Sequence, residues 1–499
     1  MSAGELCAWL REYAATRLNS QLMDERRCMP PHVVMDLGNR GVLGLLADTQ
    51  YGGLGLSQPE SLAVFEQLGA IDLTLAVFVG IHNGLGIRPI ERFGGDALKA
   101  ELLPQLATGR ILGAFAMSEP AAGSNARMIE AQAIADGDGW RLRGTKLWVG
   151  NGSWAGAINV VARRRPEEGG GMCVFAVRAG VRGLRMGPEA MTTGMRAIVQ
   201  NEVVLDDVRV TQSDLLGVAG DGFEVANDMF GVARLGISAI ALGGLRRCAQ
   251  LAHRFASRRA ISTGPMLANA RTREVLAEMI ASVTAAESLV RYTAARCDGL
   301  APPAHLAAIC KAVVPELLWQ AADRTTQLLG GRGYIESNGL PQLVRDARLL
   351  RIFEGPTETL EMHLGSAVLG NMVEIFDGAS EARTRVEAWT RKLSAALEDT
   401  RGDARIAATQ HAKLAVGQLS AWGLLAAVVE QRGDDPLSQL AKRWAFAQLE
   451  SRAAALASPL VADVDVVERA IADYRDVIGD IEQTLPGEDH ALDPMLRRS

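Results

Sequence analysis

The stretch QLLGGRGYIESNGLPQLVRDARLLRIFEGPTE, residues 327–358, carries a carboxylate in an unusual setting near its end. Glu354 follows the apolar pair Ile352 and Phe353 and precedes Gly355 and Pro356. Burial of a carboxylate is costly unless the group is paired or neutral, and a Gly-Pro step marks a turn at the end of an element. Glu354 is therefore either an exposed surface residue without a chemical role or a group that takes part in a reaction.

The rest of the chain has the composition of an ordinary globular protein. Its 499 residues are 48% hydrophobic and 22% charged, which allows roughly two to four domains and a large core. The net charge of −6 provides no electrostatic footprint for nucleic acid, so no such partner is expected. The six scattered cysteines form no CxxC pair, which fits a reducing compartment. The seven histidines lack metal-ligand spacing, so no metal is expected.

Two observations bear on the location of the protein. The longest apolar candidate, GISAIALGGL (236–245), is too short to span a bilayer, and we find no longer uninterrupted run. The N-terminus MSAGELCAWLREYAATRL has Glu5 and no apolar core, so it does not resemble a signal peptide. We therefore expect a cytoplasmic protein.

Hydrophobic periodicity divides the chain into four regions. Residues 1–111 have apolar positions at helical spacing, and residues 112–220 contain short β-branched runs separated by glycine-rich turns. Helical spacing returns in residues 221–372 and continues in residues 373–499, where about four further helices are expected. Helices, then a small antiparallel β domain, then helices predict an α+β fold rather than a doubly wound one.

Four motifs occur in a specific order along residues 1–372. They are AFAMSEPAAGSNA (114–126), GTKLWVGNGS (144–153), GFEVANDMFGVARLGISAIALG (222–243) and the stretch 327–358. This ordered set resembles the acyl-CoA dehydrogenase family. The resemblance implies an N-terminal helical domain, a small antiparallel β-barrel and a C-terminal four-helix bundle, with FAD between barrel and bundle. The helical region 373–499 is then an extension.

The same resemblance implies a cofactor site built from several motifs. Asn125 stands where the family usually has Asp, and Gly150 stands where it has Thr or Ser. Ser124 is expected where flavin and the pantetheine of the thioester meet. Arg259 is expected to bind the FAD pyrophosphate across a subunit interface, since the planar guanidinium suits phosphate. The other residues expected at FAD are Phe115, Met117, Ser118, Trp148, Val149, Gly150, Gln327, Gly330, Gly331, Thr357 and Glu358.

The reaction implied by the resemblance is α,β-dehydrogenation of an acyl thioester, with hydride passing to flavin N5. Glu354 aligns with the base that removes the α-proton, and Ile352 and Phe353 would desolvate it and raise its pKa. Some members carry the base just before the position of Arg234, but here that residue is Ala233. The residues expected at the substrate are Ser124, Phe230, Arg234, Phe353 and Gly355.

Simpler interpretations of these residues stay open. The 114–126 segment could form an ordinary turn loop, and Trp148 could occupy a core position. Arg234 could belong to a structural ion pair, and Arg259 could belong to a solvated basic run. Two other functions on the same fold also stay open. One is a flavin-dependent monooxygenase, against which Glu354 argues, and the other is a nucleic-acid-binding relative, against which the acidic residues of 373–499 argue.

The resemblance also implies partners. The substrate would be an acyl-CoA or acyl-carrier-protein thioester of fatty acid metabolism, and the electron acceptor an electron-transfer flavoprotein. The expected assembly is a homodimer or homotetramer, because very-long-chain members with a C-terminal extension can be dimers.

Overall fold

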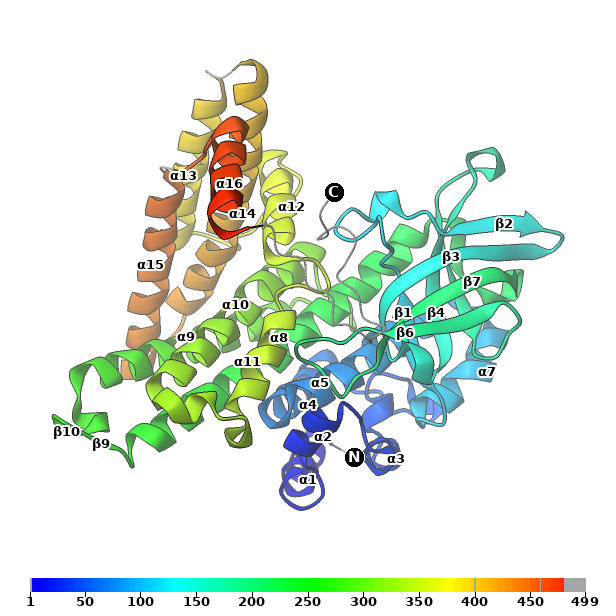
Figure 1. Ribbon diagram of the computed structural model, residues 1–499, viewed down its shortest axis with the longest axis horizontal. Coiled ribbons are helices and arrows are strands. Elements are labelled where there is room, and N and C mark those ends of the chain that lie inside the picture. Colours follow the sequence, from blue (N-terminus) through cyan, green and yellow to red (C-terminus); the bar gives the residue numbers. More distant parts are fainter. Residues whose placement is uncertain (1, 399–400, 458, 480–499) are drawn as a thin grey trace. The chain divides into compact units, whose positions relative to one another are not determined.

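The structure, a computed structural model, describes residues 2–398, 401–457 and 459–479. Helices precede a β-sheet, and further helices follow it (Figure 1), so the predicted α+β fold is confirmed. By internal contacts the chain forms two units, Met1–Glu450 and Ser451–Ser499.

The N-terminal region is helical because its segments begin with strong capping residues. Ser2 and Glu5 form a capping box on the first helix, and Ser57 and Glu60 form another on the fourth. A π-helical segment, Ile81–Ile87, continues from the fifth helix into the sixth. The α-helices are α1 (Ala3–Thr16), α2 (Ser20–Arg26), α3 (Pro31–Asn39), α4 (Gln58–Ile71), α5 (Leu73–Gly80), α6 (Arg88–Phe93) and α7 (Asp96–Ala107).

The middle region forms one mixed sheet in the order β6-β7-β3-β2-β4-β5-β8, with β1 paired to β4. The pairings β1–β4 and β2–β4 are parallel, whereas the sequence predicts an antiparallel sheet. A short hairpin enforces antiparallel pairing only between consecutive strands, and these pairs are not consecutive. The strands are β1 (Leu112–Ala116), β2 (Gln132–Asp136), β3 (Gly139–Gly150), β4 (Ala155–Arg164), β5 (Met172–Arg178), β6 (Leu184–Glu189), β7 (Gln200–Thr211) and β8 (Leu215–Gly220).

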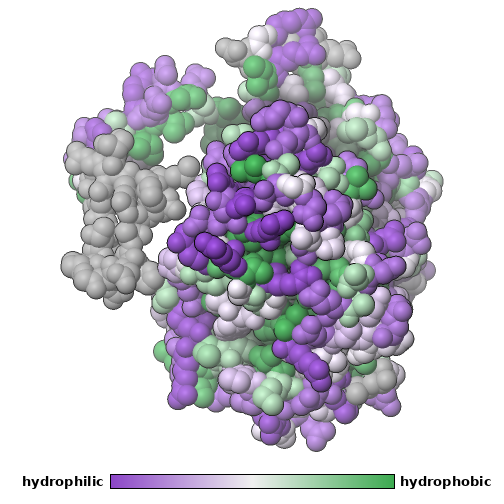
Figure 2. All heavy atoms as spheres, turned by 90° about the vertical axis from the view of Figure 1, so that its right-hand side faces the viewer, coloured by the Kyte–Doolittle hydropathy of each residue, from purple (hydrophilic) through white to green (hydrophobic). Residues whose placement is uncertain are grey.

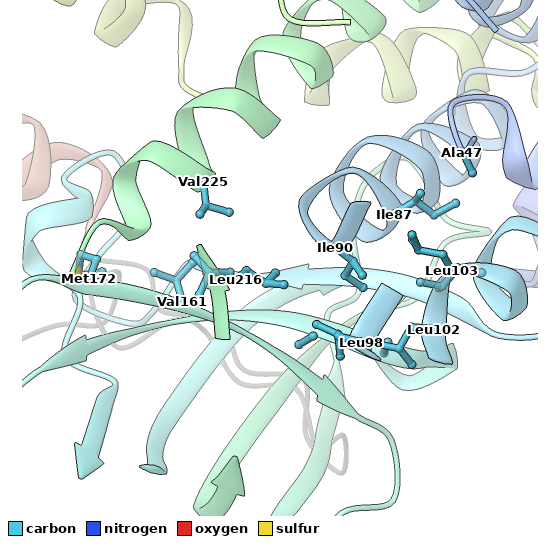
Figure 3. Packing of buried hydrophobic residues seen from close by; sticks show 14 of the residues in the cluster. Ala47, Ile87, Ile90, Leu98, Leu102, Leu103, Val161, Met172, Leu216 and Val225 are labelled. Atoms are coloured by element: carbon cyan, nitrogen blue, oxygen red, sulfur yellow. The ribbon is translucent and has the colours of Figure 1, made fainter. Parts of the chain in front are cut away.

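One apolar core joins the N-terminal helices to the sheet. Figure 3 shows Ile87, Ile90 and the α7 leucines close to side chains of the sheet. Val225, from the helix that follows the sheet, belongs to the same cluster. The outer surface is different: on the face seen in Figure 2, hydrophobic residues form small groups among hydrophilic ones.

The bundle after the sheet consists of long, largely buried helices. Helices α8 (Gly222–Ala256), α9 (Ala270–Ala294) and α10 (Ala304–Leu329) pack on one another. A short β9–β10 hairpin (Ala260–Ile261 and Gly264–Pro265) follows α8. Helices α11 (Leu340–Leu349) and α12 (Thr357–Leu369) complete this part, and α12 packs on α10.

The extension contains the four helices that the sequence predicts, within the part of the chain that the structure describes. They are α13 (Glu381–Glu398), α14 (Gly402–Glu430), α15 (Pro436–Ala457) and α16 (Val464–Ile478). The predicted helical segments include residues 399, 458 and 480–483, which lie outside the described residues.

Helix α14 crosses α12 at two facing glycines. A Cβ at Gly365 would lie 1.7 Å from the carbonyl oxygen of Lys413, and one at Gly417 would lie 1.7 Å from that of Glu361. The two backbones therefore touch, and neither position has room for a side chain. This contact attaches the extension to the bundle.

We expected no segment long and apolar enough to span a bilayer. By length and composition, this expectation is wrong. Three helical segments, Leu73–Phe93, Gly222–Ala256 and Arg405–Glu430, are long and apolar enough to cross a membrane. Polar residues interrupt each of these segments, so the length of the longest uninterrupted apolar run does not reveal them. Between 72% and 89% of the most apolar window of each is buried inside the protein, so this surface is used for packing between elements.

The glycine crossing can be tested by adding one methyl group. Alanine in a helix interior normally stabilises by about 1 kcal/mol relative to glycine. Gly4→Ala, in the first turn of α1 where a Cβ meets no atom within 4 Å, should be neutral or stabilise by less than that amount. Gly417→Ala should instead lower the free energy of unfolding by about 1–3 kcal/mol through overpacking. Urea denaturation of both variants measures the difference, and a stabilised Gly417→Ala would contradict the tight crossing.

Candidate active site

Glu354 lies in the turn between α11 and α12 in a strained backbone conformation. Its φ is +56°, and that of Gly355 is +97°. The left-handed region is uncommon for a residue with a side chain and costs of order 1–3 kcal/mol. The turn is closed by the Thr357 amide, which donates to the carbonyl oxygen of Arg351 at 3.3 Å.

Two cationic side chains hold the main chain of this turn. Arg234 Nε donates to the carbonyl oxygen of Glu354 at 3.0 Å, and Lys311 Nζ donates to that of Gly355 at 2.5 Å. Lys311 is fully buried, with 0% exposure. Lys311 is not among the predicted site residues, although a single lysine in the apolar run LAAICKAVV (306–314) is a signal of the same kind as Arg234.

Glu354 and Phe353 form part of the lining of an apolar pocket. Ala233 also lines it, so the alternative base position is at the pocket but carries no acid. Glu354 Oε2 is buried and has no hydrogen-bond partner among the residues that the structure describes. Apart from Leu46, the other lining residues come from α4, α5, the π-helical segment and α8, among them Phe65, Val77, Ile81, Leu85, Ile237 and Ile240.

This environment makes the Glu354 carboxyl group a weaker acid than an exposed glutamate. Burial raises the pKa of Glu354 to about 7, against the opposing effects of the Arg234 and Lys311 charges. The apolar pocket is the physical cause, because it disfavours the ionised form. A carboxylate that ionises near neutral pH suits proton abstraction.

The predicted flavin loop is connected to this turn through aromatic rings. Phe115 lies on β1 and meets the Phe230 ring edge-to-face, with centroids 5.9 Å apart. The Arg234 guanidinium lies 5.4 Å from the centroid of the same Phe230 ring. Phe115, Phe230 and Arg234 therefore form a continuous line from the sheet to Glu354. Ser124 is exposed further along the loop.

A buried ion pair supports the start of that loop. Lys146 Nζ lies 2.5 Å from Glu119 Oε1 and donates to the carbonyl oxygen of Met117 at 3.2 Å. The other oxygen, Glu119 Oε2, accepts the Glu130 amide at 2.6 Å. Ser118 contributes its carbonyl oxygen, which accepts the Leu147 amide at 2.9 Å. Burial lowers the pKa of Lys146 to about 8, and Glu119 opposes that change.

The TKLWVG segment presents three residues in different ways. Trp148 has φ of +53° at an irregularity of the β3–β7 pairing and is 59% exposed, so it does not occupy a core position. Val149 is buried in the core of the sheet, so only its backbone is accessible to a ligand. A Cβ at Gly150 would lie 2.7 Å from Ile81 Cδ1. Ile81, which the sequence analysis did not select, thus fills the space beside Gly150.

The remaining predicted cofactor residues fall into two groups. Thr357 and Glu358 begin α12 beside the Glu354 turn, Thr357 buried and Glu358 exposed. Arg259 follows the end of α8, roughly 33 Å along that helix from Arg234. Gln327, Gly330 and Gly331 are exposed at the end of α10. Leu328 packs against an apolar cluster that contains Ala252 and Ala256 of α8, so this group shares one end of the bundle and is not brought to Glu354 within one chain.

Comparison with known proteins decides the family. Three family models match the chain. The acyl-CoA dehydrogenase N-terminal domain matches residues 4–110, the middle domain residues 114–208 and the C-terminal domain residues 220–369. The chain belongs to the acyl-CoA dehydrogenase family. Members are FAD-dependent oxidoreductases that act on CH–CH bonds, so the predicted enzyme class and cofactor are confirmed.

Two curated members of the family illustrate the similarity. An acyl-CoA dehydrogenase of Bacillus subtilis is 29% identical over 352 residues, which cover 70% of this chain and 93% of the relative. The human mitochondrial very long-chain specific acyl-CoA dehydrogenase is 32% identical over 332 residues, covering 64% of this chain and 50% of the relative.

Solved structures agree on the fold. Butyryl-CoA dehydrogenase from Megasphaera elsdenii has a TM-score of 0.71 and 27% identity, covering 74% of this chain and 98% of that one. An acyl-CoA dehydrogenase from Bacillus anthracis complexed with FAD has a TM-score of 0.77 and 20% identity, covering 97% of this chain and 92% of that one. The fold likeness therefore includes most of the extension.

The residues present fit a flavin beside the Glu354 pocket. The exposed indole of Trp148 offers an apolar face that a stacked ring system would cover. It is two residues from Gly150, whose neighbour Ile81 lines the pocket. An exposed aromatic face thus lies on the strand whose Gly150 packs against a residue of the pocket wall, as a site for an isoalloxazine ring requires.

The buried Lys146–Glu119 pair provides a test of the flavin loop. Removal of one partner leaves an uncompensated buried charge, which costs about 3–5 kcal/mol. We expect Glu119→Gln and Lys146→Met each to lower the free energy of unfolding by this amount and to reduce the FAD content of the purified protein.

The double variant Glu119→Gln with Lys146→Met supplies the control. It removes both charges, so it should recover much of the stability lost in either single variant. Additive losses in a double-mutant cycle would show that the two side chains do not interact.

Proposed function

We propose that this protein is an acyl-CoA dehydrogenase that oxidises an acyl thioester to the 2-enoyl thioester. The observation that carries the proposal is Glu354, a buried carboxylate with one unpaired oxygen at the wall of an apolar pocket. The raised pKa of about 7 matches the task of a general base. The family membership supplies the reaction class, and the pocket supplies the place for the acyl chain.

In this proposal each residue of the turn has one task. The acyl chain lies in the pocket, and Glu354 takes the α-proton through its unpaired Oε2. The Glu354 amide faces the thioester carbonyl and stabilises the negative charge that develops on its oxygen. Gly355 lets the substrate approach the backbone, and Phe353 and Phe230 exclude water. FAD, when bound, would supply the acceptor for the hydride that leaves the β-carbon.

The proposed cofactor contacts divide between two subunits. Phe115, Met117, Ser118, Ser124, the 148–150 segment, Thr357 and Glu358 serve the flavin of their own chain. Arg259, Gln327, Gly330 and Gly331 lie at the far end of the bundle, so we propose that they serve FAD bound to a second copy. This supports a homo-oligomer, a dimer or a tetramer.

The finer assignments belong to the same proposal. The thioester is carried on CoA or on an acyl-carrier protein, the electron acceptor is an electron-transfer flavoprotein, and the enzyme works in the cytoplasm. We also propose the four regions 1–111, 112–220, 221–372 and 373–499 as its domains, with the last as an added helical part.

Glu354→Gln provides the central test. The amide keeps the size of the side chain but cannot take a proton, so we expect normal FAD content and a loss of at least 10³-fold in anaerobic flavin bleaching by acyl-CoA thioesters. In the unaltered enzyme the rate should fall as the pH drops below about 7, because the base becomes protonated.

A matched exposed carboxylate controls for the substitution itself. Glu12→Gln lies on α1 at an exposed position and should bleach at the rate of the unaltered protein. Undiminished bleaching in Glu354→Gln would overturn the assignment of the base.

Pocket length gives a second test of the proposed function. A Cβ at Gly84 meets no atom within 4 Å although Gly84 is buried at the pocket wall, so a side chain there would project into the pocket. Gly84→Val should lower kcat/KM for longer acyl-CoA thioesters more than for short ones, at about 0.8 kcal/mol per methylene displaced. A uniform loss across chain lengths would show that the acyl chain lies elsewhere.

A further inference from the structure

The buried side chain of Lys311 has no role in the proposed reaction as described above. Within the described residues, its ammonium donates one hydrogen bond, from Nζ to the Gly355 carbonyl oxygen at 2.5 Å. A buried ammonium is costly, and a leucine or methionine would fill the same apolar helix without that cost. The position therefore calls for a role that an apolar side chain cannot perform.

Lys311 and Arg234 hold two successive carbonyl groups from two different helices. Arg234, on α8, takes the carbonyl of Glu354, and Lys311, on α10, takes that of Gly355. These two peptides carry the positive φ values of the turn. Pinning both carbonyls fixes the strained backbone and hence the direction in which the Glu354 side chain leaves it.

Arg234 and Lys311 act on the Glu354 carboxylate by charge, whereas their hydrogen bonds go to the main chain. The two cations lie close enough to favour the ionised form of Glu354, yet their hydrogen bonds go to main-chain oxygens. Within residues 2–398, 401–457 and 459–479, Glu354 Oε2 has no hydrogen-bond partner. A direct hydrogen bond to Oε2 would stabilise the carboxylate further and lower its pKa, which would make it a weaker base. Bonding to the backbone lets the charge act while the oxygen stays free.

We propose that Lys311 is a positioning residue for Glu354, which fixes the turn through the Gly355 carbonyl and stabilises the ionised base by its charge without a hydrogen bond to it. The inference rests on the proposed function, because it assumes that Glu354 is the base.

The charged groups around Lys311 determine the expected sign. Glu354 and Glu358 attract its ammonium, whereas Arg234 and Arg351 repel it; Arg351 is itself paired with Glu316 at 2.6 Å. Burial lowers the pKa of Lys311 to about 7. Because the Lys311 charge lowers the pKa of Glu354, its removal should raise that pKa and move the acid limb of the activity to higher pH.

The test compares Lys311→Met and Lys311→Arg as FAD-loaded full-length proteins. We expect Lys311→Met to shift the acid limb of anaerobic flavin reduction by acyl-CoA upward by at least about half a pH unit, with a larger rate loss at pH 6 than at pH 9. Lys311→Arg keeps the charge and should return the limb toward its original position. Lys99→Met, on α7 outside the pocket lining, controls for loss of a lysine.

A role confined to folding would give a different result. It predicts an equal loss at every pH together with reduced FAD content, and an unshifted limb in a variant that retains FAD overturns the proposal. If Lys311→Met does not retain FAD, Lys311→Gln keeps a donor for the Gly355 carbonyl without the charge, and the same shift decides.

Failure of the proposed function is recognised separately. In that case the unaltered enzyme shows no acyl-CoA-dependent flavin reduction, and both proposals fall together. An active unaltered enzyme with an unshifted Lys311→Met limb overturns only the role of Lys311.

Discussion

The structure is organised around the burial of one carboxylate. Glu354 lies at an apolar pocket in a left-handed backbone conformation, two features that each cost free energy. The turn persists because side chains from two helices bind its carbonyl groups. Burial raises the pKa of this carboxylate to about 7, and this property supports its proposed role as the base.

The sheet and the helices meet at this turn through a small number of contacts. Phe115 reaches from β1 to Phe230, which lies one helical turn before Arg234. Gly150 at the end of β3 leaves room for Ile81 of the π-helical segment, whose backbone departs from the regular α-helix beside the pocket. Such π-segments occur frequently at functional sites. The shared core in Figure 3 keeps these parts in place.

The extension is part of the packed chain up to Glu450 rather than a loose tail. The facing glycines of α12 and α14 bring two backbones into contact, and Arg385 of α13 is ion-paired with Glu450 of α15. The family descriptions end at residue 369, whereas the Bacillus anthracis fold likeness covers 97% of the chain. The added helices are therefore a feature that some, but not all, of the compared proteins share.

The sequence by itself determined the order of helices, strands and helices, the family and the identity of the candidate base. Periodicity and capping are local properties, and the ordered motifs are readable without coordinates. The sequence could not show that two strand pairings are parallel, that Trp148 is exposed while Val149 is buried, or that Arg259 lies far from Glu354. It also did not identify Lys311 or Ile81. These facts depend on contacts between residues distant in the chain, and only the tertiary structure decided them. A lone lysine in an apolar run can indicate a buried cation, but the carbonyl group to which it donates cannot be read from the local sequence.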